Sequence, residues 1–107
     1  MKTLVGDIGN TLTKLCLFNE KKLIIKEYNI ETAKITNKKN LINFFKPILN
    51  KNIKKNILFS SVEPKVYKKI NKLLKEKKYF VFEIKKLPLK NLIKINIDKY
   101  NQLGSDR

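Results

Sequence analysis

The sequence predicts one α/β domain, in which a three-stranded antiparallel meander is followed by strand-helix-strand units in a mixed sheet. Short alternating apolar runs fill the first third of the chain, whereas helical periodicity appears only from residue 38 onward. A chain of 107 residues with 42% hydrophobic content supplies one hydrophobic core but not two, so we expect residues 1–107 to form a single domain.

Polar breaks divide the first third of the chain into three predicted strands, at residues 2–8, 11–18 and 22–28. Gly9 and Asn10 supply a tight turn between the first two strands. In the second strand, Leu15 and Leu17 are two residues apart, so they should face the same side of the sheet. The polar residues 29–37 predict a connecting loop.

An amphipathic helix is predicted from residue 38, because apolar residues recur at helical spacing in Leu41, Phe45, Ile48 and Leu49. Pro47 lies inside this pattern and lacks a backbone N–H, so the helix should kink there or end early.

A second strand-helix-strand unit follows in the sequence. The continuous apolar run at residues 57–59 is typical of a strand buried on both faces. Pro64 then opens a helix, whose apolar stripe consists of Val66, Ile70, Leu73 and Leu74, with lysines on the opposite side. Residues 79–84 form the last predicted strand.

The net charge of +16 arises from 25 basic and 9 acidic residues and raises the question of nucleic-acid binding. Every basic residue except Arg107 is lysine, whereas base recognition and bidentate phosphate contacts favour arginine. The lysines are also scattered along the whole chain rather than gathered in one arm. We therefore interpret them as a solvated surface and expect no nucleic-acid partner.

Several classes of site and location are excluded by composition. The chain has no histidine, so His-based triads and His-ligated metals are absent from it. The single cysteine, Cys16, lies in an alternating apolar run and should be a buried, inert thiol. No apolar stretch is long enough to cross a membrane, and Asp7 interrupts the opening segment where a secretory signal would continue, so we expect a cytoplasmic protein.

The most informative segment for chemistry runs from Gly6 to Thr11, where an acid ends a buried strand and a small-residue turn follows at once. Gly9 allows the backbone to approach a ligand closely, and the turn N–H groups together with the Thr11 hydroxyl suit a phosphate. Asp7 suits a Mg²⁺ ion. An ordinary hairpin turn explains the glycine but neither the acid nor the threonine. No P-loop sequence occurs in the chain.

Three motifs follow one another along the chain: Asp7-Ile8-Gly9-Asn10-Thr11, Ser60-Ser61-Val62-Glu63-Pro64 and Leu103-Gly104-Ser105-Asp106-Arg107. In this order they resemble the motifs of the type III pantothenate kinases, which belong to the actin-like ATPases with a ribonuclease H-like fold. Each motif is modest alone, but the ordered set spans the whole chain.

In the first motif, the resemblance implies that Asp7 organises the catalytic metal. Gly9, Asn10 and Thr11 would form the ATP phosphate site. Lys14 would be a further phosphate contact, although a solvated lysine on an edge strand is an equally good interpretation.

In the last motif, the resemblance implies that Gly104, Asp106 and Arg107 line the pantothenate pocket. Asp106 would be the base for the substrate hydroxyl, and Arg107 a cationic partner of the substrate. Where many relatives have an aromatic residue that packs on pantothenate, this chain has Ile97, with Tyr100 three residues later. Neither is assigned a role.

The middle motif contributes no reactive group by this reasoning. Ser60 and Ser61 have no accompanying base, so we expect them to cap the following helix or to line the cleft.

The function that the resemblance implies is ATP-dependent phosphorylation of pantothenate to 4′-phosphopantothenate, which opens coenzyme A synthesis. It also implies Mg²⁺, a monovalent cation (K⁺ or NH₄⁺) and a homodimer. Because family members continue with a second half, we expect this chain to be an N-terminal part that is inactive alone. The alternative is a non-catalytic regulatory relative with the same fold.

Overall fold

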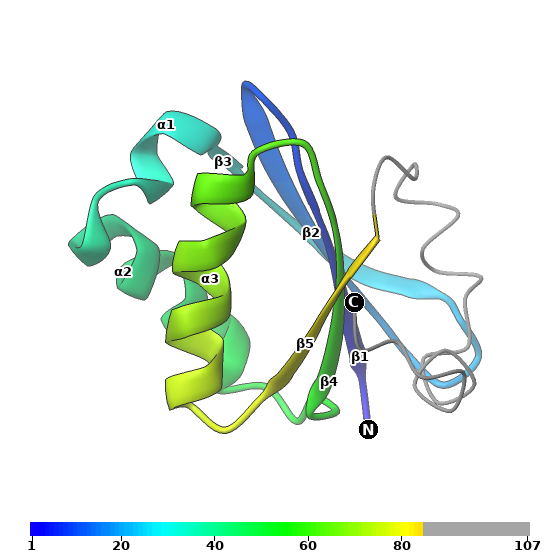
Figure 1. Cartoon of the computed structure of the whole chain (residues 1–107). Coiled ribbons are helices and arrows are strands. Elements are labelled where there is room, and N and C mark those ends of the chain that lie inside the picture. Colours follow the sequence, from blue (N-terminus) through cyan, green and yellow to red (C-terminus); the bar gives the residue numbers. More distant parts are fainter. Residues whose placement is uncertain (85–107) are drawn as a thin grey trace.

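The computed structural model describes residues 1–84 of the chain, and these form a five-stranded sheet with helices on one side (Figure 1). The strands lie in the order β3-β2-β1-β4-β5. The elements are β1 (Thr3–Ile8), β2 (Leu12–Phe18), β3 (Ile24–Glu31), α1 (Thr32–Ile35), α2 (Lys38–Leu49), β4 (Asn56–Ser61), α3 (Pro64–Glu76) and β5 (Phe80–Ile84).

The pairing of the strands confirms the predicted α/β architecture of the ribonuclease H-like kind. Strands β1, β2 and β3 form an antiparallel meander, and β4 then pairs with β1 in parallel. Strand β5 pairs with β4, also in parallel. The chain between parallel strands must cross over the sheet, and it does so through α1 and α2 before β4 and through α3 before β5.

The main hydrophobic core lies between the sheet and the helices. Helix α2 contributes Leu41, Phe45 and Ile48, and α3 contributes the whole stripe predicted for it. Leu15 and Leu17 of β2 join the same core, which confirms that they share a face.

The opposite face of the sheet is apolar as well. Ile57 and Phe59 belong to the helix-side core, so Leu58 between them must face the other way, and it is also fully buried. The prediction of a strand buried on both faces is therefore confirmed. Val5 and Cys16 are likewise fully buried outside the helix-side core, and Cys16 is a free thiol as expected.

The prediction of a loop over residues 29–37 is wrong. Strand β3 continues to Glu31, and α1 follows it directly. The polar composition is misleading because β3 is an edge strand whose outward residues face water, while Ile30 packs against the core and Ile35 lies in it. The strand also begins two residues later than predicted, at Ile24.

The remaining helix boundaries agree closely with the sequence. Helix α2 passes Pro47 and ends at Leu49, so the prediction of an early end at Pro47 is wrong. Pro47 lacks one backbone donor, and it stands in the last turn, where few residues follow it in the helix. Pro64 occupies the first turn of α3, as predicted. No helix within residues 1–84 is long and apolar enough to span a membrane.

Candidate phosphate-binding site at the end of strand β1

Asp7 lies near the carboxyl end of β1, the central strand of the sheet. In register it stands opposite Lys14 of β2 on one side and Ser60 of β4 on the other. Figure 1 shows that the β1–β2 turn, α1 and the start of α3 all lie at this end of the sheet. The structure therefore places the first two motifs of the sequence side by side.

The carboxylate of Asp7 is half-buried, and burial raises its pKa above the ordinary value because the charged form loses hydration. The positive charge of Lys14 acts in the opposite direction and lowers the pKa, but by less. Within residues 1–84 the carboxylate forms no hydrogen bond and no ion pair. A cation bound to Asp7 would neutralise the carboxylate, with which no described residue forms an ion pair.

The turn after β1 exposes backbone donors. The Gly9 N–H donates to the carbonyl of Leu12 at 3.0 Å, which closes the turn around Asn10 and Thr11. Both residues are exposed, and within the described part of the chain their N–H groups have no acceptor. A Cβ atom at Gly9 would lie 2.8 Å from the Leu12 carbonyl oxygen, so the turn requires glycine there. This arrangement suits an anion, as predicted.

Lys14 is exposed, but it does not lie on an edge strand. Strand β2 runs between β1 and β3, so the expectation of an edge position is wrong. The antiparallel register instead puts Lys14 beside Asp7, where its charge is felt by the carboxylate. No ion pair between the two is formed in the described structure, which leaves the ammonium group open to a phosphate.

The serines of the second motif are both buried and differ in position. Ser60 of β4 is buried and stands in register beside Asp7. The Ser61 hydroxyl accepts a hydrogen bond from the Glu63 N–H at 3.1 Å, so it stabilises the chain just before α3. Glu63, rather than either serine, is the N-cap residue of that helix.

Sequence reasoning missed Thr32, whose hydroxyl donates to the Gly9 carbonyl at 2.8 Å. This residue begins α1, inside the segment predicted to be a loop. No local signal marks it, because the contact joins residues 23 positions apart.

The substrate residues of the third motif, Gly104, Asp106 and Arg107, lie outside the described residues, as do Ile97 and Tyr100. Their roles remain predictions.

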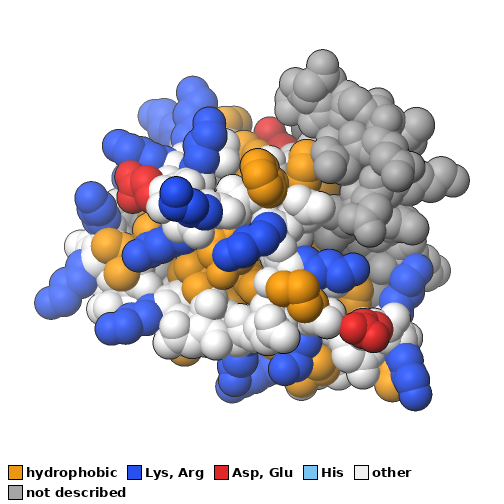
Figure 2. Space-filling model, turned by 90° about the horizontal axis from the view of Figure 1, so that it is seen from below, with side chains coloured by type: hydrophobic (Ala, Val, Ile, Leu, Met, Phe, Trp, Pro, Cys, Tyr) orange, Lys and Arg blue, Asp and Glu red, His pale blue; other side chains and the backbone are white. Residues whose placement is uncertain are grey.

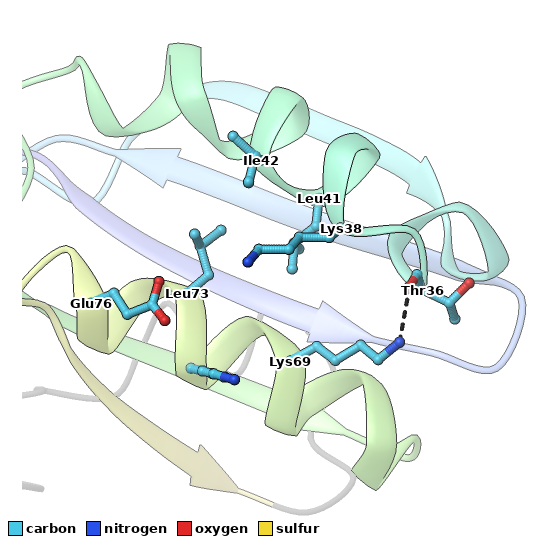
Figure 3. A pocket seen from close by; sticks show the side chains of 8 residues that line it. Thr36, Lys38, Leu41, Ile42, Lys69, Leu73 and Glu76 are labelled. Carbon is cyan, nitrogen blue, oxygen red and sulfur yellow. Dashed lines mark hydrogen bonds between the residues drawn. The ribbon is translucent and has the colours of Figure 1, made fainter.

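A hollow of about 180 Å³ lies elsewhere, between α2 and α3, and is lined by Thr36, Leu41, Leu73 and several lysines (Figure 3). It contains neither Asp7 nor any residue of the adjoining turn. The Lys69 ammonium closes one end by donating to the Thr36 carbonyl at 2.9 Å. Figure 2 shows lysines spread over the face seen there, so lysines beside a hollow reflect the overall composition. We place the candidate site at Asp7, where a carboxylate lies beside a turn with exposed backbone donors.

Comparison with known proteins bears on the family of the chain. The chain spans 42% of the length of a curated type III pantothenate kinase from Pelagibacter ubique (strain HTCC1062), to which it is 45% identical over 97% of its own length. Among solved structures, it is similar to the activator of the 2-hydroxyisocaproyl-CoA dehydratase from Clostridium difficile with bound ADPNP. That similarity has a TM-score of 0.49 and 17% identity, and it covers 79% of this chain and 29% of the other.

The family model of the type III pantothenate kinases matches residues 3–107, which include all three motifs. The chain therefore belongs to the type III pantothenate kinase family.

Proposed function

We propose that the full-length protein transfers a phosphoryl group from ATP to pantothenate and forms 4′-phosphopantothenate, the first step of coenzyme A synthesis. The observation that carries this proposal is the half-buried Asp7 carboxylate beside a turn with free backbone donors, in a chain that matches the family over residues 3–107.

The described residues fit a Mg²⁺ ion at Asp7. This carboxylate has no partner among residues 1–84, and no group of three or more metal-ligating side chains occurs there. Magnesium is typically held by one or two carboxylates together with substrate phosphates, so a single acid beside a phosphate site is the expected arrangement. When bound, the ion would neutralise charge on the phosphates.

The turn residues would position ATP. The N–H groups of Asn10 and Thr11 and the Thr11 hydroxyl would donate to phosphate oxygens, and Lys14 would add a positive charge beside Asp7. Phosphoryl transfer depends mainly on positioning and on electrostatic stabilisation, which is what such a turn supplies.

The acceptor half of the reaction rests on the third motif. Asp106 would accept the proton of the pantothenate hydroxyl, because this segment offers no histidine for that role. Gly104 and Arg107 would line the pantothenate pocket. A homodimer and a requirement for K⁺ or NH₄⁺, both implied by the family resemblance, complete the proposal, together with the cytoplasmic location expected from the sequence.

The direct test is to incubate the purified full-length protein with pantothenate, ATP and Mg²⁺ in potassium buffer and to detect phosphopantothenate by mass spectrometry. We expect product with the wild type and a severe loss with Asp7→Asn. Glu27→Gln, an exposed acid on edge strand β3, serves as the matched control and should keep full activity. Absence of product from folded wild-type protein would refute the proposal.

A further inference from the structure

Thr32 contacts the candidate phosphate turn at two points. Its hydroxyl donates to the Gly9 carbonyl at 2.8 Å, and its backbone N–H donates to the Thr11 carbonyl at 2.9 Å. The two carbonyls flank the exposed turn residues Asn10 and Thr11. Thr32 itself is only 3% exposed, so both contacts are made from the interior.

A second buried hydroxyl completes the arrangement. The Oγ1 atoms of Thr13 and Thr32 lie 2.9 Å apart, and Thr13 is fully buried. A hydroxyl has one proton, and Thr32 uses its own for the Gly9 carbonyl, so Thr13 must be the donor to Thr32. The result is a directed chain from Thr13 to Thr32 to Gly9, in which each bond polarises the next.

Because the peptide bond is planar, the contact of Thr32 with the Gly9 carbonyl also fixes the direction of the Asn10 N–H. Within residues 1–84 no peptide bond is cis, and in a trans peptide the C=O and the following N–H point in opposite directions. Holding the Gly9 carbonyl toward buried Thr32 therefore turns the Asn10 N–H away from the interior and toward solvent. Without the Thr32 hydroxyl, this peptide is free to rotate and to present its carbonyl oxygen to an incoming phosphate, which repels it.

We propose that Thr32 is a positioning residue for the ATP phosphates, acting through the Gly9–Asn10 peptide. This inference rests on the proposed function, because it takes the turn to be the phosphate site. Thr13 supports Thr32 but makes no contact with the turn carbonyls in the described structure, so its contribution is the smaller one.

The alternative is that the hydroxyls only stabilise the fold, as buried hydrogen bonds do generally. The two interpretations differ in what each substitution removes. Thr32→Val keeps the branched shape and the backbone bond to Thr11 but leaves the Gly9 carbonyl without its donor. Thr13→Val also removes a buried hydroxyl but leaves the bond to Gly9 in place. Thr32→Ser keeps that bond and loses only a methyl group.

The experiment measures ATP affinity by calorimetry, KM for ATP and for pantothenate, kcat and the melting temperature for the full-length wild type and these three variants. Thr32→Val should weaken ATP binding and raise KM for ATP about tenfold, the effect of one misaligned hydrogen bond to a charged group. KM for pantothenate should be unchanged. Thr32→Ser and Thr13→Val should stay within about twofold of the wild type in ATP affinity, although Thr13→Val should melt at a lower temperature.

The amide resonance of Asn10 gives a readout that does not depend on turnover. In the wild type it should shift on addition of Mg·ATP, and in Thr32→Val this shift should be lost while other turn resonances persist. Equal losses of ATP affinity in Thr13→Val and Thr32→Val would overturn the positioning role in favour of a structural one.

The same measurements, made on Asp7→Asn as well, separate this inference from the function on which it rests. If Asp7→Asn abolishes Mg·ATP binding while Thr32→Val binds it normally, the positioning role is wrong and the proposed function stands. If folded Asp7→Asn and Thr32→Val both bind Mg·ATP as the wild type does, the phosphate site at this turn is wrong, and the role of Thr32 is wrong with it.

Discussion

Gly6→Ala should strongly destabilise the protein, because the core leaves no room for a methyl group at this position. Gly6 precedes Asp7 in β1 and pairs with Leu15 on one side and Phe59 on the other. A Cβ atom there would lie 2.3 Å from Cε1 and 2.5 Å from Cδ1 of Phe59, and 2.7 Å from Cδ2 of Leu15. These distances are far inside normal carbon–carbon contact of about 3.5–4.0 Å.

The loss of stability in Gly6→Ala depends on how tightly the neighbouring side chain of Phe59 is packed. Phe59 is fully buried, and its ring packs edge-on against Tyr67 of α3, with centroids 6.4 Å apart. A shift of the ring would therefore disturb its contact with that helix. Overpacking of this kind costs about 1–3 kcal/mol, and three simultaneous clashes place Gly6→Ala near 3 kcal/mol. For a domain of this size, that lowers the melting temperature by roughly 10–20 °C.

Thermal melting followed by circular dichroism measures the effect, and a double-mutant cycle identifies its cause. Phe59→Leu removes the ring and destabilises the core on its own. If the clash is the cause, Gly6→Ala should reduce stability less in the Phe59→Leu background than in the wild type. The loss of stability in the double variant should then be smaller than the sum of the two single losses. An unchanged melting temperature in Gly6→Ala, or strictly additive losses in the pair, would refute the reasoning.

Three further predictions concern the ionisable groups. Asp7→Asn should severely impair Mg²⁺-dependent turnover, because an amide cannot neutralise the charge of the metal as a carboxylate does. Burial raises the pKa of Asp7, so its ionised form is disfavoured in the folded protein, and the same variant should raise the metal-free melting temperature at pH 7. This gain should vanish below about pH 3, where both folded and unfolded wild type carry a protonated carboxyl; a gain independent of pH would contradict the desolvation argument. Asp106→Asn should lower kcat by roughly 10²–10⁴-fold with ATP affinity preserved in calorimetry, and a parallel loss of ATP binding would place Asp106 in the nucleotide site instead. Burial, and secondarily the charge of Glu27, raises the pKa of the Cys16 thiol, so iodoacetamide should label it in urea but not in native protein, as followed by mass spectrometry. Rapid labelling of native Cys16 would show that β2 opens readily.

The sequence by itself determined the strands and helices whose apolar pattern has a clear period. The stripes of α2 and α3 repeat at helical spacing, and the run at residues 57–59 has no polar break, so each could be recognised from neighbours in the chain. It also determined the family, because the motifs are local and their order is visible without coordinates. The candidate site of Asp7, Gly9 and Thr11 was found in this way.

Only the tertiary structure decided what depends on contacts between distant residues. The end of β3 and the presence of α1 were missed, because an edge strand exposed to water has no apolar period to reveal it. The antiparallel register placed Lys14 beside Asp7 on an inner strand, which no local pattern specifies. The contact of Thr32 with Gly9 crosses 23 residues, and the sheet brings the two together only once β2 and β3 have paired. Sequence thus identified the candidate chemical groups. The fold decided which buried groups contact them, because hydrogen bonds between distant residues leave no local period.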